Sequence, residues 1–194
     1  MVARTYLSSH ERSRSAMIGK LEQRGIDDRC VLAAMTVVPR ELFVQPSDVL
    51  AAYDDRSLPI GEGQTMSPPS VIAAMLQVLE LDPGDTVLEI GTGSGYTAAL
   101  LSQLVSHVYT VERDPVLAVR AAERLATLGY DGIDVHCGDG VHGWPQFAPY
   151  DAIIITEPGL PISDALIEQL AEGGRLVRVD DVTPWPGACS AKSA

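Results

Sequence analysis

The sequence has few cysteines and few basic residues, and each shortage argues against a class of protein. Its 194 residues include three cysteines and no Cys-x-x-Cys pair. We therefore expect no disulfide framework and no metal site, and we expect a reducing compartment. Lys and Arg number 14 against 26 Asp and Glu, which gives a net charge of −12. We expect no binding to nucleic acid or to an anionic membrane surface, because both depend on basic residues.

The sequence also lacks a long apolar run and a recognisable leader. A membrane-spanning helix needs about 20 apolar residues, and no stretch of the sequence approaches that length. The N-terminal residues do not combine an apolar core with a small-residue cleavage site, so we expect no signal peptide. With the reducing compartment expected above, we expect a cytoplasmic protein. We also expect residues 1–179 to form a single domain, because domains commonly have about 100–200 residues.

Strand and helix patterns alternate from residue 86 onward. Short apolar runs predict strands at 86–90, 107–112, 132–136, 151–156 and 175–179, and helical spacing predicts helices at 96–104, 114–128 and 163–171. This alternation predicts a doubly wound α/β fold, in which a mostly parallel sheet carries helices on both faces. Earlier in the chain, helices are predicted at 11–24, 28–37 and 68–79. The irregular stretch 39–69 is rich in proline and glycine, and so long a stretch in a compact domain is typically functional.

A glycine-rich loop follows the first predicted strand of the sheet. Gly91, Gly93 and Gly95 come directly before a predicted helix, where glycine permits positive φ and close approach of a ligand. The third glycine stands one residue earlier than in the dinucleotide fingerprint G-x-G-x-x-G. Glu89, two residues before the loop, would repel a pyrophosphate and attract a cation. The loop therefore disfavours a nicotinamide dinucleotide as the ligand.

Acidic residues lie at or after the ends of three successive predicted strands. Glu89 precedes the glycine loop, Glu112 ends the second strand, and Asp139 follows the third. A carboxylate at the position of Glu112 can accept hydrogen bonds from ribose hydroxyls. Three carboxylates at one edge of the sheet suit a nucleoside with an amino-acid tail and a positive centre, as in S-adenosylmethionine. The alternative is that these are ordinary turn glycines and solvated loop acids.

These motifs belong to a set of segments that resembles the protein-L-isoaspartate O-methyltransferases, repair enzymes that methylate isoaspartyl carboxylates in damaged proteins. The segments that carry the resemblance are residues 38–44, 53–61, 63–68, 87–96, 138–140, 143–144 and 150–155. Segment 63–68 is the most specific, because the glycine loop alone would match many methyltransferases. The resemblance implies a Rossmann-like fold, a carboxyl methyltransferase activity, S-adenosyl-L-methionine as cofactor and an isoaspartyl protein or peptide as partner.

The resemblance also implies roles for individual residues. Ser67 matches the active-site serine of the family, and Thr65 and Met66 match neighbours that close over the cofactor. The other implied cofactor contacts are Glu89, Gly91 and Gly93 at the methionine end, Glu112 at the ribose, and Asp139 and Gly140 at the adenine. We accordingly expect residues 1–80 to supply N-terminal helices and the active-site loop, and residues 81–179 to form the cofactor-binding core.

Carboxyl methylation does not require the protein to remove a proton from the acceptor. Model carboxyl groups have pKa values of about 4 and are ionised at pH 7, so no general base is needed. Catalysis would depend on positioning and on exclusion of water. We expect residues 57–69 to form a lid and Ser67 to donate a hydrogen bond to the acceptor carboxylate. The competing role for Ser67 is to cap the helix that begins near Pro68.

Two segments depart from the pattern of the family. The family has small residues after the fourth strand of the core, where this chain has Thr156, Glu157, Pro158 and Gly159. The family also continues with further strands, whereas residues 180–194 match nothing in that pattern. We expect a C-terminally short member with a sheet that stops near residue 179 and a disordered tail. Its exposed edge would favour self-association, and cofactor binding would survive better than turnover.

Other functions remain open at this point. The same cofactor chemistry could act on an aspartate of one dedicated peptide, or the chain could be a weakly active or non-catalytic nucleoside-binding homologue. An NAD-dependent oxidoreductase is disfavoured by Glu89 and by Tyr96, which occupies the position of the last fingerprint glycine.

Overall fold

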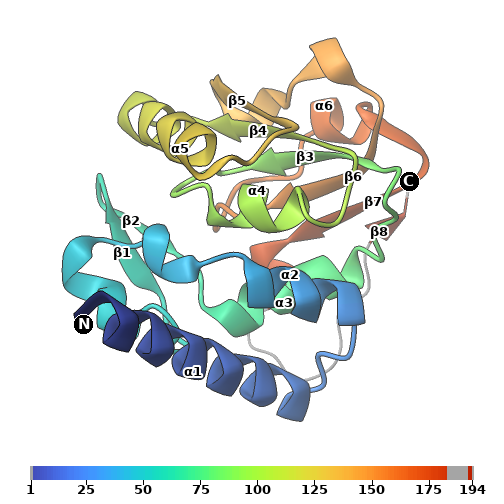
Figure 1. Ribbon diagram of the computed structural model, residues 1–194. Coiled ribbons are helices and arrows are strands. Elements are labelled where there is room, and N and C mark those ends of the chain that lie inside the picture. The colour runs from blue at the N-terminus through green and yellow to red at the C-terminus, as the bar shows by residue number, and fades with distance from the viewer. Residues whose placement is uncertain (1, 183–191, 194) are drawn as a thin grey trace.

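A parallel sheet forms the centre of the molecule, and helices lie on both of its sides (Figure 1). The computed structural model describes residues 2–182 and 192–193, with side chains from residue 10 to residue 182. The parallel strands are β3 (Thr86–Ile90), β4 (His107–Glu112), β5 (Ile133–Cys137), β6 (Tyr150–Ile155) and β7 (Leu170–Arg178), in the order β5-β4-β3-β6-β7. The predicted doubly wound fold is confirmed. Strand order reverses between β3 and β6, which is where such sheets bind ligands.

Local signals in the sequence set the ends of several helices. The carboxylate of Asp114 accepts hydrogen bonds from two N–H groups in the first turn of α5 (Pro115–Leu128), and Gly129 ends that helix at φ 75°. Asp28 caps α2 (Arg29–Val37) in the same way. The remaining helices are α1 (Val2–Gln23), α3 (Pro69–Val78), α4 (Tyr96–Leu101) and α6 (Asp164–Ile167).

Alternation along the strands divides the buried apolar residues into two clusters. Val87 and Val108 face a cluster that includes residues of all five helices α1–α5. Leu88 and Ile90 face a smaller cluster, which α6 and neighbouring loops cover. The N-terminal helices therefore lie on the same side of the sheet as α4 and α5, and Figure 1 shows α6 on the other side.

The proline- and glycine-rich stretch contains a hairpin that the sequence analysis did not predict. Strands β1 (Leu58–Gly61) and β2 (Gln64–Met66) pair antiparallel. Their turn uses three consecutive residues with positive φ, namely Gly61 at 99°, Glu62 at 50° and Gly63 at 71°. Two short 3₁₀ helices, η1 (Arg40–Leu42) and η2 (Pro46–Ala51), precede it.

The C-terminal part of the sheet differs from the prediction. Strand β7 begins at Leu170, opposite Tyr150, and after a bulge its pairing resumes at Arg175. The predicted helix 163–171 consequently ends at Ile167, because the chain has already entered the sheet. The sheet also does not stop near residue 179, since β8 (Lys192–Ser193) pairs antiparallel with β7.

This added strand corrects the expectation of an exposed edge at β7. Residues 175 and 176 of β7 pair with β8, so the edge predicted to favour self-association is covered there. Residues 179–181 form a 3₁₀ turn. The remainder of the predicted disordered tail, residues 183–191 and 194, lies outside the described residues.

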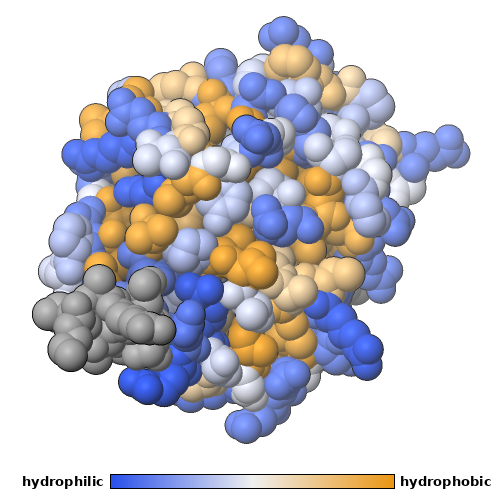
Figure 2. Space-filling model, viewed as in Figure 1, coloured by the Kyte–Doolittle hydropathy of each residue, from blue (hydrophilic) through white to orange (hydrophobic). Residues whose placement is uncertain are grey.

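Hydrophilic and hydrophobic residues are interspersed on the face shown in Figure 2. Within residues 2–182 and 192–193, no helix has the length and apolarity needed to span a membrane. The same part of the chain contains no cluster of three or more His, Cys, Asp and Glu side chains suited to hold a metal ion.

Candidate functional site

A cavity of about 380 Å³ lies beyond the carboxyl ends of β3, β4 and β6. Its volume falls within the range of about 300–1,000 Å³ that is typical of small-molecule sites. The residues that line it are Ser57, Ile60, Gly63, Gln64, Thr65, Ser67, Pro68, Val71, Gly91, Gly93, Glu112, Arg113, Leu117, Thr156, Glu157, Pro158, Val179 and Asp180. The cavity therefore brings the β1–β2 hairpin and the glycine loop together at the reversal of strand order.

Two glycines of the loop have conformations and surroundings that a side chain would disturb. Gly91 has φ 96° and Gly93 has φ 55°. A Cβ on Gly91 would lie 2.6 Å from Thr156 Oγ1, and one on Gly93 would lie 3.1 Å from Ile60 Cδ1. The Thr156 hydroxyl donates to the Gly91 carbonyl oxygen at 2.6 Å. Glycine thus lets the loop lie close against both the β6 end and the hairpin.

Glu112 lies in the cavity wall and holds the glycine loop in place. One carboxylate oxygen accepts the Gly93 N–H at 2.8 Å, and the other accepts the Asp114 N–H at 2.9 Å. A carboxylate oxygen can accept more than one hydrogen bond. Glu112 can therefore support the loop and still accept a hydroxyl of a ligand.

Glu89 has a different environment from that of Glu112. It is completely buried beneath the loop and does not line the cavity. Its Oε2 accepts the Thr110 hydroxyl at 2.7 Å, while its Oε1 has no hydrogen-bond partner among the described residues. Burial raises the pKa of Glu89 to about 8, and the nearby negative charge of Glu112 adds to the rise. At neutral pH this carboxyl group is therefore mainly protonated.

The three predicted loop residues before α3 lie on or beside the cavity. Ser67 and Thr65 line it. Met66 is buried, and its sulfur accepts the Ser94 hydroxyl at 3.5 Å, which connects the hairpin to the glycine loop. Helix α3 is capped at Pro68 without a side-chain hydrogen bond. The capping role considered for Ser67 is therefore wrong.

Asp139 and Gly140 follow β5 and lie outside this cavity. The Asp139 carboxylate accepts the Val141 N–H at 3.0 Å and caps the 3₁₀ turn η3 (Gly140–His142). A Cβ on Gly140 would lie 2.3 Å from Ile90 Cγ2. Gly140 thus lets this turn approach the end of β3, but the structure does not bring the pair to the cavity wall.

Sequence reasoning missed two features of the site. Arg113 and Glu157, both in the cavity wall, form an ion pair at 3.1 Å. Arg40 is completely buried, donates to the Ser67 carbonyl oxygen at 2.7 Å, and lies 4.8 Å from the ring centre of Tyr96. A charged residue inside the largely apolar segment 38–44 was the available signal for Arg40. No local signal paired Arg113 with Glu157.

Comparison with protein families identifies one family model that matches most of the chain. The model is described as protein-L-isoaspartate(D-aspartate) O-methyltransferase and matches residues 12–181. A protein-L-isoaspartate O-methyltransferase from Roseiflexus castenholzii is 51% identical over 164 residues, which are 84% of this chain and 75% of the relative. One from Methanoculleus marisnigri is 53% identical over 167 residues, 86% of this chain and 76% of the relative.

Solved structures show the same fold. A protein-L-isoaspartate O-methyltransferase structure superposes with a TM-score of 0.75 at 32% identity, over 84% of this chain and 54% of the other. A Plasmodium falciparum structure described as a protein-L-isoaspartate O-methyltransferase in complex with S-adenosyl-L-homocysteine gives a TM-score of 0.70 at 24% identity, over 86% and 82% of the two chains. The second likeness supports the architecture of the sheet and helices.

Proposed function

Because this chain belongs to the protein-L-isoaspartate(D-aspartate) O-methyltransferase family, we propose that it transfers a methyl group from S-adenosylmethionine to the carboxylate of L-isoaspartyl residues. Protein repair is the role that follows from such methylation. The observation that carries the proposal is the single cavity wall shared by Ser67, the glycine loop and Glu112. Ser67, whose hydroxyl is expected to contact the acceptor, and Glu112, whose carboxylate is expected to contact the nucleoside, thus line one cavity of suitable size.

The residues around the loop fit the proposed cofactor. Side chains at Gly91 or Gly93 would narrow the space beside the loop, so their absence leaves backbone available to a ligand. Glu112 lines the cavity and would accept ribose hydroxyls. Glu89 accepts a hydrogen bond from the Thr110 hydroxyl, which also contacts Thr92 of the loop, and its other oxygen has no partner among the described residues. S-adenosylmethionine, when bound, supplies an electrophilic methyl group on a sulfonium centre. We assign Thr65 and Met66 to the hairpin that covers it, and Asp139 and Gly140 to the adenine end.

Positioning is the main task of the protein in this reaction. The acceptor carboxylate is already ionised at neutral pH. The Ser67 hydroxyl would donate a hydrogen bond to it and hold one oxygen in line with the methyl group. Arg40 fixes the backbone of Ser67 through the carbonyl oxygen, and the β1–β2 hairpin limits access of water. Catalysis by orientation and water exclusion needs no further acid or base.

A related substrate is the second candidate. The segment after β6 carries Glu157, paired with Arg113 at the cavity wall, where the family pattern has small residues. This ion pair puts two large, oppositely charged side chains in the cavity wall, and it favours methylation of an aspartate in a dedicated peptide as the alternative. We place the protein in the cytoplasm, because Cys30 and Cys137 are free and exposed, as a reducing compartment allows.

Paired peptides test the proposal. Labelled S-adenosylmethionine is incubated with the full chain and with an isoaspartyl peptide or its aspartyl twin. Methyl ester on the isoaspartyl peptide alone is the expected result. Ester on the aspartyl peptide alone would establish the second candidate. Absence of ester on both peptides, with the cofactor bound by calorimetry, would leave a nucleoside-binding homologue.

A further inference from the structure

A second cavity, of about 210 Å³, lies between the β1–β2 hairpin and α5. It is lined by Phe43, Val44, Gln45, Pro46, Ile60, Gly93, Ser94, Leu117, Arg120 and Arg124. Ile60, Gly93 and Leu117 also line the larger cavity. The two spaces therefore share a wall, but only the smaller one contains a pair of arginines.

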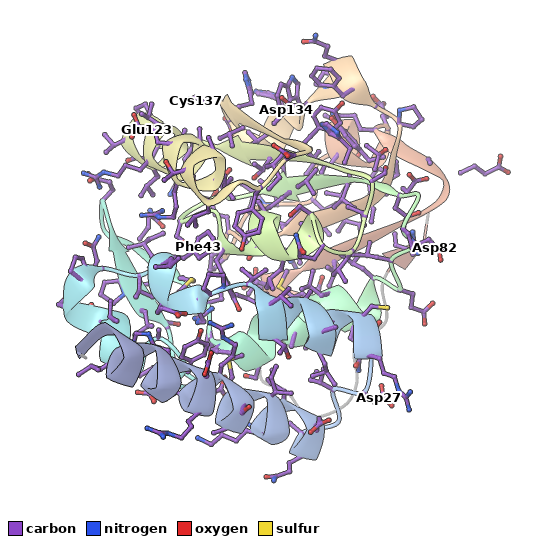
Figure 3. The ribbon with its side chains drawn as sticks, viewed as in Figure 1. Asp27, Phe43, Asp82, Glu123, Asp134 and Cys137 are labelled. Carbon is purple, nitrogen blue, oxygen red and sulfur yellow. The ribbon has the colours of Figure 1, made fainter. Side chains whose placement is uncertain are left out.

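Arg124 is half-buried in this second cavity, where it contacts a backbone oxygen and an aromatic ring. It donates to the Ser94 carbonyl oxygen at 2.7 Å, and its guanidinium carbon lies 6.0 Å from the ring centre of Phe43. Figure 3 shows Phe43 between the N-terminal segment and the layer of α4 and α5. In the part of the chain that the structure describes, no carboxylate forms an ion pair with Arg124. Burial and the positive charge of Arg120 lower the pKa of Arg124.

Arg120 stands one helical turn before Arg124, on the same side of α5. Its guanidinium pairs at 3.1 Å with Glu62, at the turn of the hairpin. This ion pair is exposed, and exposed ion pairs contribute little to stability. An anion that contacts both arginines can therefore displace the Glu62 carboxylate at little cost.

We propose that this cavity binds an oxyanion, a carboxylate or phosphate group, between the guanidinium groups of Arg120 and Arg124. Guanidinium N–H groups match the geometry of these anions. Two like charges on neighbouring turns repel each other, and a bound anion removes that repulsion. Glu62 then acts as an internal competitor for the site.

Two sources can supply the anion. One is a peptide bound at the larger cavity, whose acidic side chain would extend past the shared wall to the arginines. Free inorganic phosphate has the same chemistry. The peptide source rests on the proposed function, whereas the phosphate source is independent of it.

Calorimetric titration of the full chain with inorganic phosphate tests the free-anion source. Arg124→Gln and Arg120→Gln should each weaken phosphate binding about tenfold, as expected for the loss of a charged hydrogen-bonding group. Glu62→Gln should strengthen it several-fold, because the competitor is gone. Arg12→Gln and Glu22→Gln, at exposed positions of α1, are the charge-matched controls and should leave the affinity unchanged. Arg120 is exposed, so its variant should fold even if the Arg124 variant does not.

Methylation of two isoaspartyl peptides, with Glu or Gln beside the isoaspartyl residue, tests the substrate source. The wild-type chain should show a several-fold higher kcat/KM for the Glu peptide, and this preference should disappear in Arg120→Gln and Arg124→Gln. Phosphate binding without a peptide preference would identify the free anion as the ligand. If wild type methylates neither peptide, the proposed function fails and phosphate titration alone decides. The anion site is overturned if neither phosphate affinity nor peptide preference depends on the two arginines.

Discussion

At the scale of single residues, three carboxylates near one edge of the sheet have three different environments. Glu112 lies in the cavity wall and accepts two backbone N–H groups. Glu89 is completely buried with one oxygen unpaired. Asp139 caps a turn outside the cavity. Their contributions to ligand binding, stability and pH dependence should therefore differ, although the sequence places all three at or near the ends of successive strands.

Removal of the Glu112 carboxylate tests its place in the cofactor site. Glu112→Ala should weaken S-adenosylmethionine binding by about 1.5–3 kcal/mol, the scale of a hydrogen bond to a charged group. Glu112→Gln keeps one oxygen acceptor and should lose less. Calorimetry measures both, with Glu123→Gln on the exposed side of α5 (Figure 3) as control. Unchanged affinity in a folded Glu112→Ala variant would remove Glu112 from the site.

Removal of the Ser67 hydroxyl should separate turnover from cofactor binding. The side chain lines the cavity and makes no capping hydrogen bond, so Ser67→Ala should leave thermal stability nearly unchanged. The methylation rate should fall about tenfold or more, from loss of an orienting hydrogen bond, with cofactor affinity preserved. Ser15→Ala in α1 is the matched control. A rate equal to that of wild type would exclude Ser67 from the transfer step.

The raised pKa of Glu89 predicts a pH dependence of stability. The folded protein holds this proton up to a pH of about 8, whereas the ordinary value is 4.5. Between these values the folded state binds more protons than the unfolded state. The free energy of unfolding should therefore fall as pH rises from 4.5 to 8, with a limiting slope of about 1.4 kcal/mol per pH unit. Urea titrations of Glu89→Gln should lack this contribution, and identical slopes for both proteins would contradict it.

At the scale of elements, local signals predicted some boundaries and failed at others. Helix α5 was predicted to within one residue because Asp114 and Gly129 are strong local start and stop signals. The β1–β2 hairpin was not, because its strands are four and three residues long in a segment rich in proline and glycine. The bulge before Arg175 concealed the start of β7, since pairing on both sides of a bulge depends on the neighbouring strand.

The same distinction holds for the candidate site. The glycine loop directly follows β3 and Glu112 ends β4, so their meeting at the sheet edge was predictable from alternation alone. The burial of the Glu89 side chain depends on which face of β3 it lies on and on which elements cover that face. The ion pair of Arg120 with Glu62 joins residues 58 positions apart. Only the folded chain brings such residues together.

Two glycines provide a matched test of the loop element. Gly91 and Gly159 have φ of 96° and 76°, but only Gly91 has a neighbour where a Cβ would stand, Thr156 Oγ1 at 2.6 Å. Alanine at either position should lower the free energy of unfolding by about 1–2 kcal/mol, because a residue with a Cβ is strained in the left-handed backbone conformation. Gly91→Ala should lose clearly more free energy of unfolding in denaturant titration, and should also weaken cofactor binding. Equal losses would show that backbone conformation alone requires glycine at Gly91.

At the scale of the whole molecule, charge is the dominant property. The net charge is −12 and the isoelectric point is near 4.6. Copies of such a chain repel one another at neutral pH, and the repulsion disappears as carboxylates are protonated. The short strand β8 covers part of the edge that suggested self-association. Self-association therefore stays a prediction, and we expect the net charge of the protein to be the main factor that governs it.

Sedimentation velocity across pH tests this control. The average mass should be lowest near pH 7 and should rise as the pH approaches 4.6, where the net charge vanishes. Added salt at pH 7 should raise it slightly by screening. Association that is equally strong at pH 7 and pH 5 would instead indicate a specific edge or surface contact.

Arg40 links three segments of the molecule directly, without the central sheet as an intermediary. Its guanidinium holds the carbonyl oxygens of Ala52 and Ser67 and lies over the ring of Tyr96, the first residue of α4. Local opening of the segment around η1 would therefore release the backbone of Ser67 while β3 and β4 still hold the glycine loop. The side of the cavity that contains Ser67 would become disordered first. The stability of the N-terminal segment therefore sets how long Ser67 keeps its position relative to the glycine loop.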